Sequence, residues 1–226
     1  MTPDAEKAAG AVQRLAETQA RIAAAAKNAG RNPADVRLIA VSKTFDAPDI
    51  LPVLQAGQRD FGENKVQEGL SKAAEIGTAG SVRWHLIGHL QSNTVKVVSR
   101  ICELVHSLDS DSAGRRLTVP ALLEVNLSGE ASKSGVPPEG LPALLAAYPD
   151  VRGLMTMPPL AADPEASRPA FRRLRELEAL LRKIVEVASK VIHADRSSLF
   201  LHDPKTGELW SLVAEGLETR QLRIPA

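Results

Sequence analysis

The sequence VRLIAVSK at residues 36–43 is an apolar run with the length of one β-strand, and it ends in a lysine. Asp46 and Pro48 follow it and predict the start of a helix that Gly57 would end. This strand and helix form one βα unit. Because the carboxyl ends of the strands face the functional site in a parallel barrel, we expect Lys43 to lie at that site.

The βα pattern continues on both sides of this unit. Thr2, Pro3 and Asp4 predict the beginning of an alanine-rich helix that runs to about Asn28. Strands are predicted at 59–64, 83–88, 102–108, 121–127 and 151–157, with helices at about 66–76 and 93–99. The alternation predicts an α/β fold with a parallel sheet that forms a TIM-type barrel. The connection at 110–120 is barely long enough for a crossover helix.

The rhythm changes after residue 169. A long helical pattern at 169–194 leads to SSLFLH at 197–202, a turn at 203–207 and LWSLVA at 209–214, which together predict an antiparallel hairpin. The barrel is therefore expected to be incomplete, or rebuilt at its C-terminal end by this hairpin. We expect the hairpin to cover an open sheet edge, so that deletion of 197–226 would promote aggregation.

The composition excludes several classes of partner. The net charge is +1, and the chain has two Trp and one Tyr, so neither a nucleic-acid surface nor an anionic membrane surface is indicated. The N-terminal segment interleaves charges with alanines and predicts neither a signal peptide nor a membrane span. Cys102 is the only cysteine, which excludes an intrachain disulfide and fits a cytoplasmic protein.

Polar residues follow several of the predicted strands. Lys43 could attack an aldehyde if apolar walls partly desolvate its amine, or it could be a solvated lysine at a strand end. Asn64 could line the same rim or cap the next helix, and His85 could face the site or be a core histidine. His85 and His89 flank a glycine after a strand, so no metal site is predicted. The loop NLSGEASKSG at 126–135 has the composition of an anion-binding loop, although solubility also explains it.

Five motifs in order carry a family resemblance: AVSKTF around Lys43, FGENKVQE around Asn64, WHLIGHLQSN around His85, LLEVNLSGEASKSG around Lys133 and RGLMTMPP around Met155. Over about residues 5–180 the chain resembles the pyridoxal phosphate homeostasis family, whose fold is shared with the N-terminal domain of alanine racemase. The resemblance implies a monomeric barrel that holds pyridoxal 5′-phosphate (PLP) as a Schiff base on Lys43, without catalytic turnover and with PLP-dependent apoenzymes as partners. It implies that Asn64 lines the cofactor and that Lys133 lies near its entrance. We also expect His85 to bind the cofactor, because it lies in the third strand, whose polar groups would converge on the rim that holds Lys43.

The chain also departs from this family. The Ser-x-Gly-Met-Ser and Arg-x-Gly-Thr motifs that hold the phosphate are absent, and Thr94 stands where a lysine is expected. The C-terminal stretch resembles the opening of a GAF domain, which suggests a barrel at 1–180 and a GAF-like fragment at 181–226. A sensory module for a cyclic nucleotide or tetrapyrrole, and a fusion with an impaired or vestigial PLP site, are the alternatives. Racemase activity is not expected, because Tyr148, the only tyrosine, lies in a turn and leaves no second base.

Overall fold

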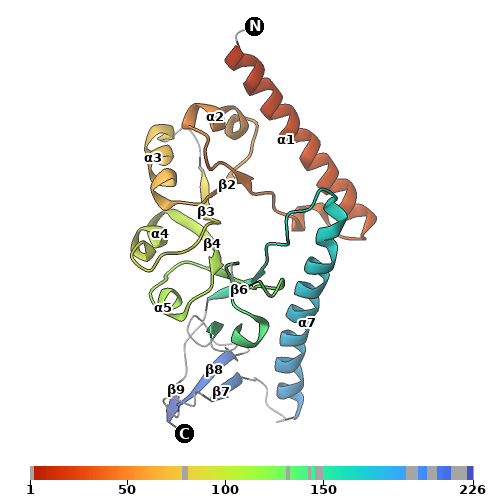
Figure 1. The fold of residues 1–226 in the computed structure, drawn as a ribbon, viewed down its shortest axis with the longest axis vertical. Coiled ribbons are helices and arrows are strands. Elements are labelled where there is room, and N and C mark those ends of the chain that lie inside the picture. Colours follow the sequence, from red (N-terminus) through yellow and green to blue (C-terminus); the bar gives the residue numbers. More distant parts are fainter. Residues whose placement is uncertain are drawn as a thin grey trace. The chain divides into compact units, whose positions relative to one another are not determined.

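The computed structural model describes residues 3–77, 81–130, 133–141, 144–145, 150–191, 198–202, 208–214 and 223–225. Within them the chain forms a six-stranded sheet in the order β1-β2-β3-β4-β5-β6 (Figure 1). Its strands are β1 (Ala40–Val41), β2 (Asp60–Glu63), β3 (Arg83–Leu86), β4 (Cys102–Leu108), β5 (Ala121–Glu124) and β6 (Val151–Met155). The pairings of β1 with β2, β2 with β3, β4 with β5 and β5 with β6 are parallel.

The predicted α/β class with a parallel sheet is thereby confirmed. The sheet is not closed into a barrel, because no pairing among the described residues joins β6 to β1. The helices are α1 (Pro3–Asn28), α2 (Ala47–Gln55), α3 (Val66–Ile76), α4 (Val95–Ile101), α5 (Asp111–Gly114) and α7 (Arg168–Val191). The connection predicted to be barely long enough for a crossover helix contains α5, which has only four residues.

Strand β1 is much shorter than the apolar run that predicted it. Only Ala40 and Val41 pair with β2, at Phe61 and Gly62. The carbonyl of Leu38 accepts a hydrogen bond from the buried Gln58 side chain at 2.8 Å instead of a ladder bond. Because a side chain satisfies this carbonyl, it needs no partner in the ladder, and residues 36–39 lie outside the strand.

Contacts divide the chain into two compact units, and the first comprises residues 1–88 and 101–103. Helix α1 packs against α2, α2 contacts α3, and α3 contacts β2 (Figure 1). Leu54, Phe61 and Trp84 are buried in this unit, and the rings of Phe61 and Trp84 lie 6.1 Å apart. This core fixes the strand ends that carry the first three motifs.

The second unit comprises residues 89–100 and 104–226. Its core includes Val98 from α4, Val105 and Leu108 from β4, and Leu123 from β5, all with exposed fractions of 0%. Helix α7 is continuous for 24 residues and contacts β6. The domain boundary proposed at residue 180 falls within this helix, and the division into 1–180 and 181–226 stays a prediction.

The predicted C-terminal hairpin is confirmed. Strand β7 (Ser198–His202) pairs antiparallel with β8 (Glu208–Ala214), and β9 (Arg223–Pro225), which the sequence analysis missed, pairs with β8. The turn at 203–207 lies outside the described residues. That the hairpin covers an open sheet edge remains a prediction.

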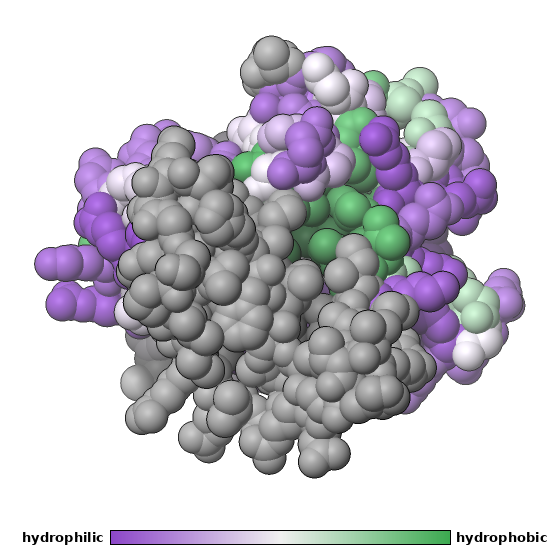
Figure 2. Space-filling model, turned by 90° about the horizontal axis from the view of Figure 1, so that it is seen from below, coloured by the Kyte–Doolittle hydropathy of each residue, from purple (hydrophilic) through white to green (hydrophobic). Residues whose placement is uncertain are grey.

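Several large apolar side chains are exposed. In the first unit they include Val41 and Phe45, which are 50% and 47% exposed, and in the second unit Met157 and Phe171. On the face drawn in Figure 2, hydrophobic side chains are exposed, and hydrophilic side chains lie along part of their border. Exposed apolar area of this kind is common at binding surfaces and at incompletely covered cores.

Candidate functional site

Lys43 lies in a tight turn directly after β1. The amide of Phe45 donates to the carbonyl of Ser42 at 3.2 Å, which closes the turn over Lys43 and Thr44. The Lys43 side chain is exposed, which corrects the expectation that apolar walls partly desolvate it. Among the described residues its ammonium makes no hydrogen bond or ion pair, so the amine is accessible and unpaired.

Asn64 lies at the matching position of the next strand. Val41 pairs with Gly62, and Lys43 and Asn64 each follow these partners by two residues. Both side chains are exposed. Because carboxyl ends of parallel strands share one edge of the sheet, Lys43 and Asn64 lie at the same edge.

Gly88 packs tightly against the backbone of Asn64. A Cβ atom built on Gly88 would lie 2.4 Å from the Asn64 carbonyl oxygen and 2.7 Å from its Cα. The amide of Ile87 donates to the carbonyl of Glu63 at 2.9 Å, which continues the pairing of β3 with β2. The third motif therefore holds the second motif in place through its backbone.

A buried polar network lies beneath this edge, and no sequence pattern predicted it. Lys72 Nζ donates to Glu63 Oε1 at 2.6 Å and to the Ser42 carbonyl at 2.7 Å, and Ser42 Oγ donates to Glu63 Oε1 at 2.6 Å. Ser42, Glu63 and Lys72 are 2%, 3% and 6% exposed. Ser42 and Glu63 lie inside the VSK and GEN motifs, but no local pattern indicated a partner on α3.

His85 does not face Lys43 or Asn64. Its ring is fully buried, and Nε2 lies 3.0 Å from Asp60 Oδ1. Arg83 donates to both Asp60 oxygens, at 2.8 and 2.7 Å. Since Asp60 and Arg83 begin β2 and β3, this contact points away from the strand ends that carry Lys43.

The Asp60 cluster changes the charge state of its members. Hydrogen bonding from Arg83 lowers the pKa of Asp60 from 3.8 to about 2. Burial lowers the pKa of His85, although its hydrogen bond to Asp60 opposes this effect. His85 is therefore neutral near pH 7, which suits a buried partner that supports the sheet.

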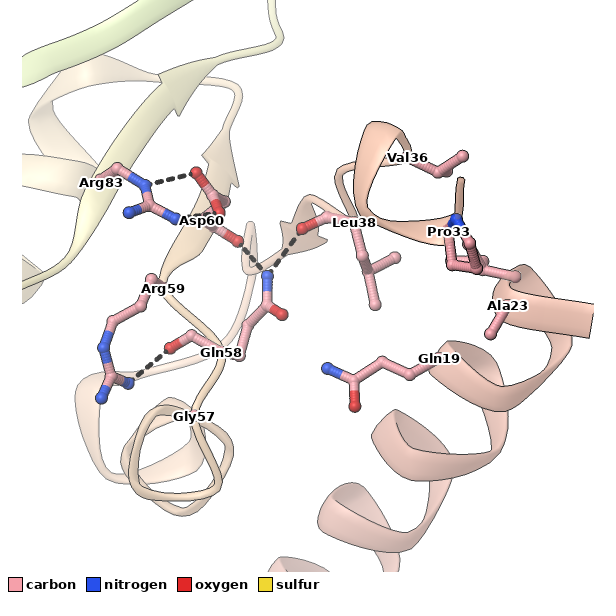
Figure 3. A pocket seen from close by; sticks show the side chains of 11 residues that line it. Gln19, Ala23, Pro33, Val36, Leu38, Gly57, Gln58, Arg59, Asp60 and Arg83 are labelled. Carbon is pink, nitrogen blue, oxygen red and sulfur yellow. Dashed lines mark hydrogen bonds and ion pairs between the residues drawn. The ribbon is translucent and has the colours of Figure 1, made fainter. Parts of the chain in front are cut away.

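A cavity of about 240 Å³ lies beside this cluster. Figure 3 shows the side chains that line it. Gln58, Asp60 and Arg83 line it at the beginnings of β2 and β3, opposite Gln19 and Ala23 of α1. The cavity therefore lies at the amino ends of the strands. Because ligands of parallel α/β sheets bind at the carboxyl ends, we do not assign the cofactor to it.

Lys133 belongs to the second unit, and its Nζ pairs with Glu130 Oε1 at 2.9 Å. Its carbonyl accepts a bond of 3.4 Å from the side chain of Asn126. Asn126 Oδ1 also accepts the backbone N–H groups of Ser128 and Gly129. These backbone N–H groups already donate to an acceptor within the loop. They therefore give no support to an anion-binding role for residues 126–135.

Two further acidic groups lie at strand ends of the second unit. Glu124, the last residue of β5, is 6% exposed, and burial followed by repulsion from Asp109 raises its pKa. His89 Nδ1 lies 3.5 Å from Asp109 Oδ2.

No group of three potential metal ligands occurs among the described residues. No helix in the described part of the chain is long and apolar enough to cross a membrane.

Comparison with known proteins places this chain in a family. The family model described as "Alanine racemase, N-terminal domain" matches residues 13–213. This match extends through most of the C-terminal segment, whose likeness to a GAF domain finds no support. The pyridoxal phosphate homeostasis protein of Pseudomonas aeruginosa is 45% identical over 179 residues, which cover 73% of this chain and 77% of the relative.

Solved structures agree with the sequence comparison. PipY of Synechococcus elongatus without PLP is 33% identical and has a TM-score of 0.66, with 76% of this chain and 82% of PipY covered. PipY with PLP bound is 34% identical and has a TM-score of 0.59, with coverages of 72% and 82%. The chain belongs to the family of alanine racemase N-terminal domains that includes the pyridoxal phosphate homeostasis proteins.

Proposed function

We propose that this protein binds pyridoxal 5′-phosphate through Lys43 and takes part in the homeostasis of that cofactor. The observation that carries the proposal is the exposed amine of Lys43, which no described residue pairs with, in a turn at the carboxyl end of β1. PLP supplies an aldehyde that condenses with a primary amine and a phosphate dianion that needs hydrogen-bond donors. The exposed primary amine of Lys43 fits the aldehyde of PLP as its reaction partner.

The other predicted residues have distinct roles in this proposal. Asn64, at the same sheet edge as Lys43, would contact the cofactor directly. His85 would act from beneath by supporting β2 through Asp60. Lys133 stays a candidate for the cofactor entrance. Catalytic turnover is not part of the proposal, because the relatives are named for homeostasis rather than for a reaction.

The proposal also covers the setting in which the protein acts. We expect a cytoplasmic monomer that exchanges PLP with PLP-dependent apoenzymes. The near-neutral net charge of +1 and the single cysteine suit that setting.

Borohydride trapping tests the role of Lys43. Incubation with PLP, reduction and peptide mass mapping should find the adduct on Lys43, and Lys43→Ala should lose it while far-UV circular dichroism is unchanged. Lys65→Ala is the matched control, since Lys65 is 78% exposed and follows the next strand of the same unit. Equal trapping in Lys43→Ala, or adducts scattered over surface lysines, would remove the proposal.

The second candidate function is a fusion whose PLP site is impaired or vestigial. The absence of the two phosphate-binding motifs favours it, because each charge-assisted hydrogen bond contributes roughly 1.5–3 kcal/mol. Trapping with pyridoxal, which lacks the phosphate, distinguishes the two readings. An intact site should favour PLP by about a hundredfold or more, whereas an impaired one should accept both aldehydes equally.

A further inference from the structure

We infer that Lys72 and Glu63 are positioning residues, which hold the turn that presents Lys43 to its aldehyde ligand. The inference rests on the proposed function of Lys43 and gives a role to Glu63, which lies inside the GEN motif, and to Lys72, which no motif identified. Neither side chain is accessible to a ligand, because Glu63 is 3% and Lys72 is 6% exposed. They act through Ser42, the residue directly before Lys43.

The turn from Ser42 to Phe45 needs contacts with residues outside it to keep its conformation. Thr44 has a φ of 69°, in the left-handed region that β-branched residues rarely occupy. A positive φ at the third position of a four-residue turn is the geometry that glycine or asparagine normally provides. Thr44 therefore stores strain next to Lys43, and such strain persists only where the surrounding contacts impose it.

Ser42 makes these contacts through hydrogen bonds of both its main chain and its side chain. Its carbonyl accepts from Phe45 N within the turn and from Lys72 Nζ outside it, at 3.2 and 2.7 Å. Its hydroxyl donates to Glu63 Oε1 at 2.6 Å. Glu63 from β2 thus fixes the side chain of Ser42, the first residue of the turn, and Lys72 from α3 fixes its carbonyl group.

Stability alone does not explain a buried ion pair at this place. Well-packed apolar side chains often stabilise a fold as much as a buried ion pair does, because desolvating two charges is costly. Glu63 Oε2 is buried and, among the described residues, has no hydrogen-bond partner, so this pair is not arranged for maximal stabilisation. An apolar pair could not donate to the Ser42 carbonyl, whereas Lys72 does.

The first test compares capture of PLP with plain accessibility of the amine. In Lys72→Met, trapping of PLP on Lys43 should slow by about tenfold, because reaction rates depend strongly on the orientation of the attacking group. Acetylation of Lys43 by acetic anhydride should keep its wild-type rate, since a small reagent reaches an exposed amine in any orientation. Lys65→Met is the matched control and should change neither rate.

A second substitution separates positioning from a general loss of structure. Thr44→Gly removes the strain, so Lys72→Met/Thr44→Gly should recover most of the lost trapping rate. If Lys72→Met fails to fold, the double variant Glu63→Gln/Lys72→Met takes its place, because it leaves no unpaired buried charge. The double variant is then used both alone and combined with Thr44→Gly. Unchanged trapping in the folded variant, or a loss that Thr44→Gly does not restore, would overturn the inference. Absence of a Lys43 adduct in the unmodified protein would instead refute the proposed function.

Discussion

Gly88 shows at the scale of one residue how a motif glycine supports the site. A methyl group on this residue would lie 2.4 Å from the carbonyl oxygen of Asn64, so backbone must move to admit it. Overpacking of this kind costs about 1–3 kcal/mol. We therefore expect Gly88→Ala to lower the free energy of unfolding by that amount in urea titrations, and to weaken PLP binding at the displaced Asn64.

Gly69 provides the control within the same unit. Its added Cβ would meet the nearest atoms at 3.7 and 3.8 Å, which is ordinary van der Waals contact. Because Gly69 lies inside α3, Gly69→Ala should stabilise the helix by up to about 1 kcal/mol. Equal stability of the two alanine variants would contradict the proposed contact between Gly88 and Asn64.

At the scale of elements, Asp60 joins the beginnings of β2 and β3 through Arg83 and His85. Its pKa falls from 3.8 to about 2 on folding, so the carboxylate contributes about 2 kcal/mol of stability. Because the pKa of the folded state is the lower one, this contribution is complete above about pH 4. It is lost as the pH falls from 3.8 towards 2.

Acid titration of Asp60→Asn measures this contribution. The variant should be less stable than the unmodified protein at pH 6, and the difference in unfolding free energy should shrink between about pH 4 and 2. Asp111→Asn is a suitable control, because the side chain of Asp111 is 61% exposed. A difference that stays constant over this interval would mean that Asp60 does not ionise in the way described.

The elements also show which features the sequence could predict. Helix α3 and strand β4 match their predicted bounds, because the hydrophobic pattern marks both of them locally and Gly77 ends α3. The rim formed by Lys43 and Asn64 followed from the rule that parallel strands share their carboxyl ends. The partners of buried polar groups did not follow, since Asp60 and His85 lie 25 residues apart and Ser42 and Lys72 lie 30 apart. Pairings at such separations depend on tertiary packing, which no local pattern encodes.

At the scale of the whole molecule, Cys102 reports on how the two units unfold. It lies in the first unit at the start of β4, and the same strand continues into the second unit from Leu104. The thiol is 8% exposed, and burial raises its pKa to about 12. Since only the thiolate reacts with disulfide reagents, Cys102 should be inert in the folded protein at pH 7.

A strand shared by both units has a consequence for cooperativity. Unfolding of either unit removes the pairing partners of part of β4, so we expect one cooperative transition rather than two. Labelling of Cys102 in increasing urea should then follow the loss of far-UV circular dichroism with the same midpoint. Labelling at a lower urea concentration would show that the first unit opens alone. In that event the Lys43 turn, which belongs to the first unit, would be lost while most of the C-terminal structure persists, and PLP binding should disappear with the labelling transition.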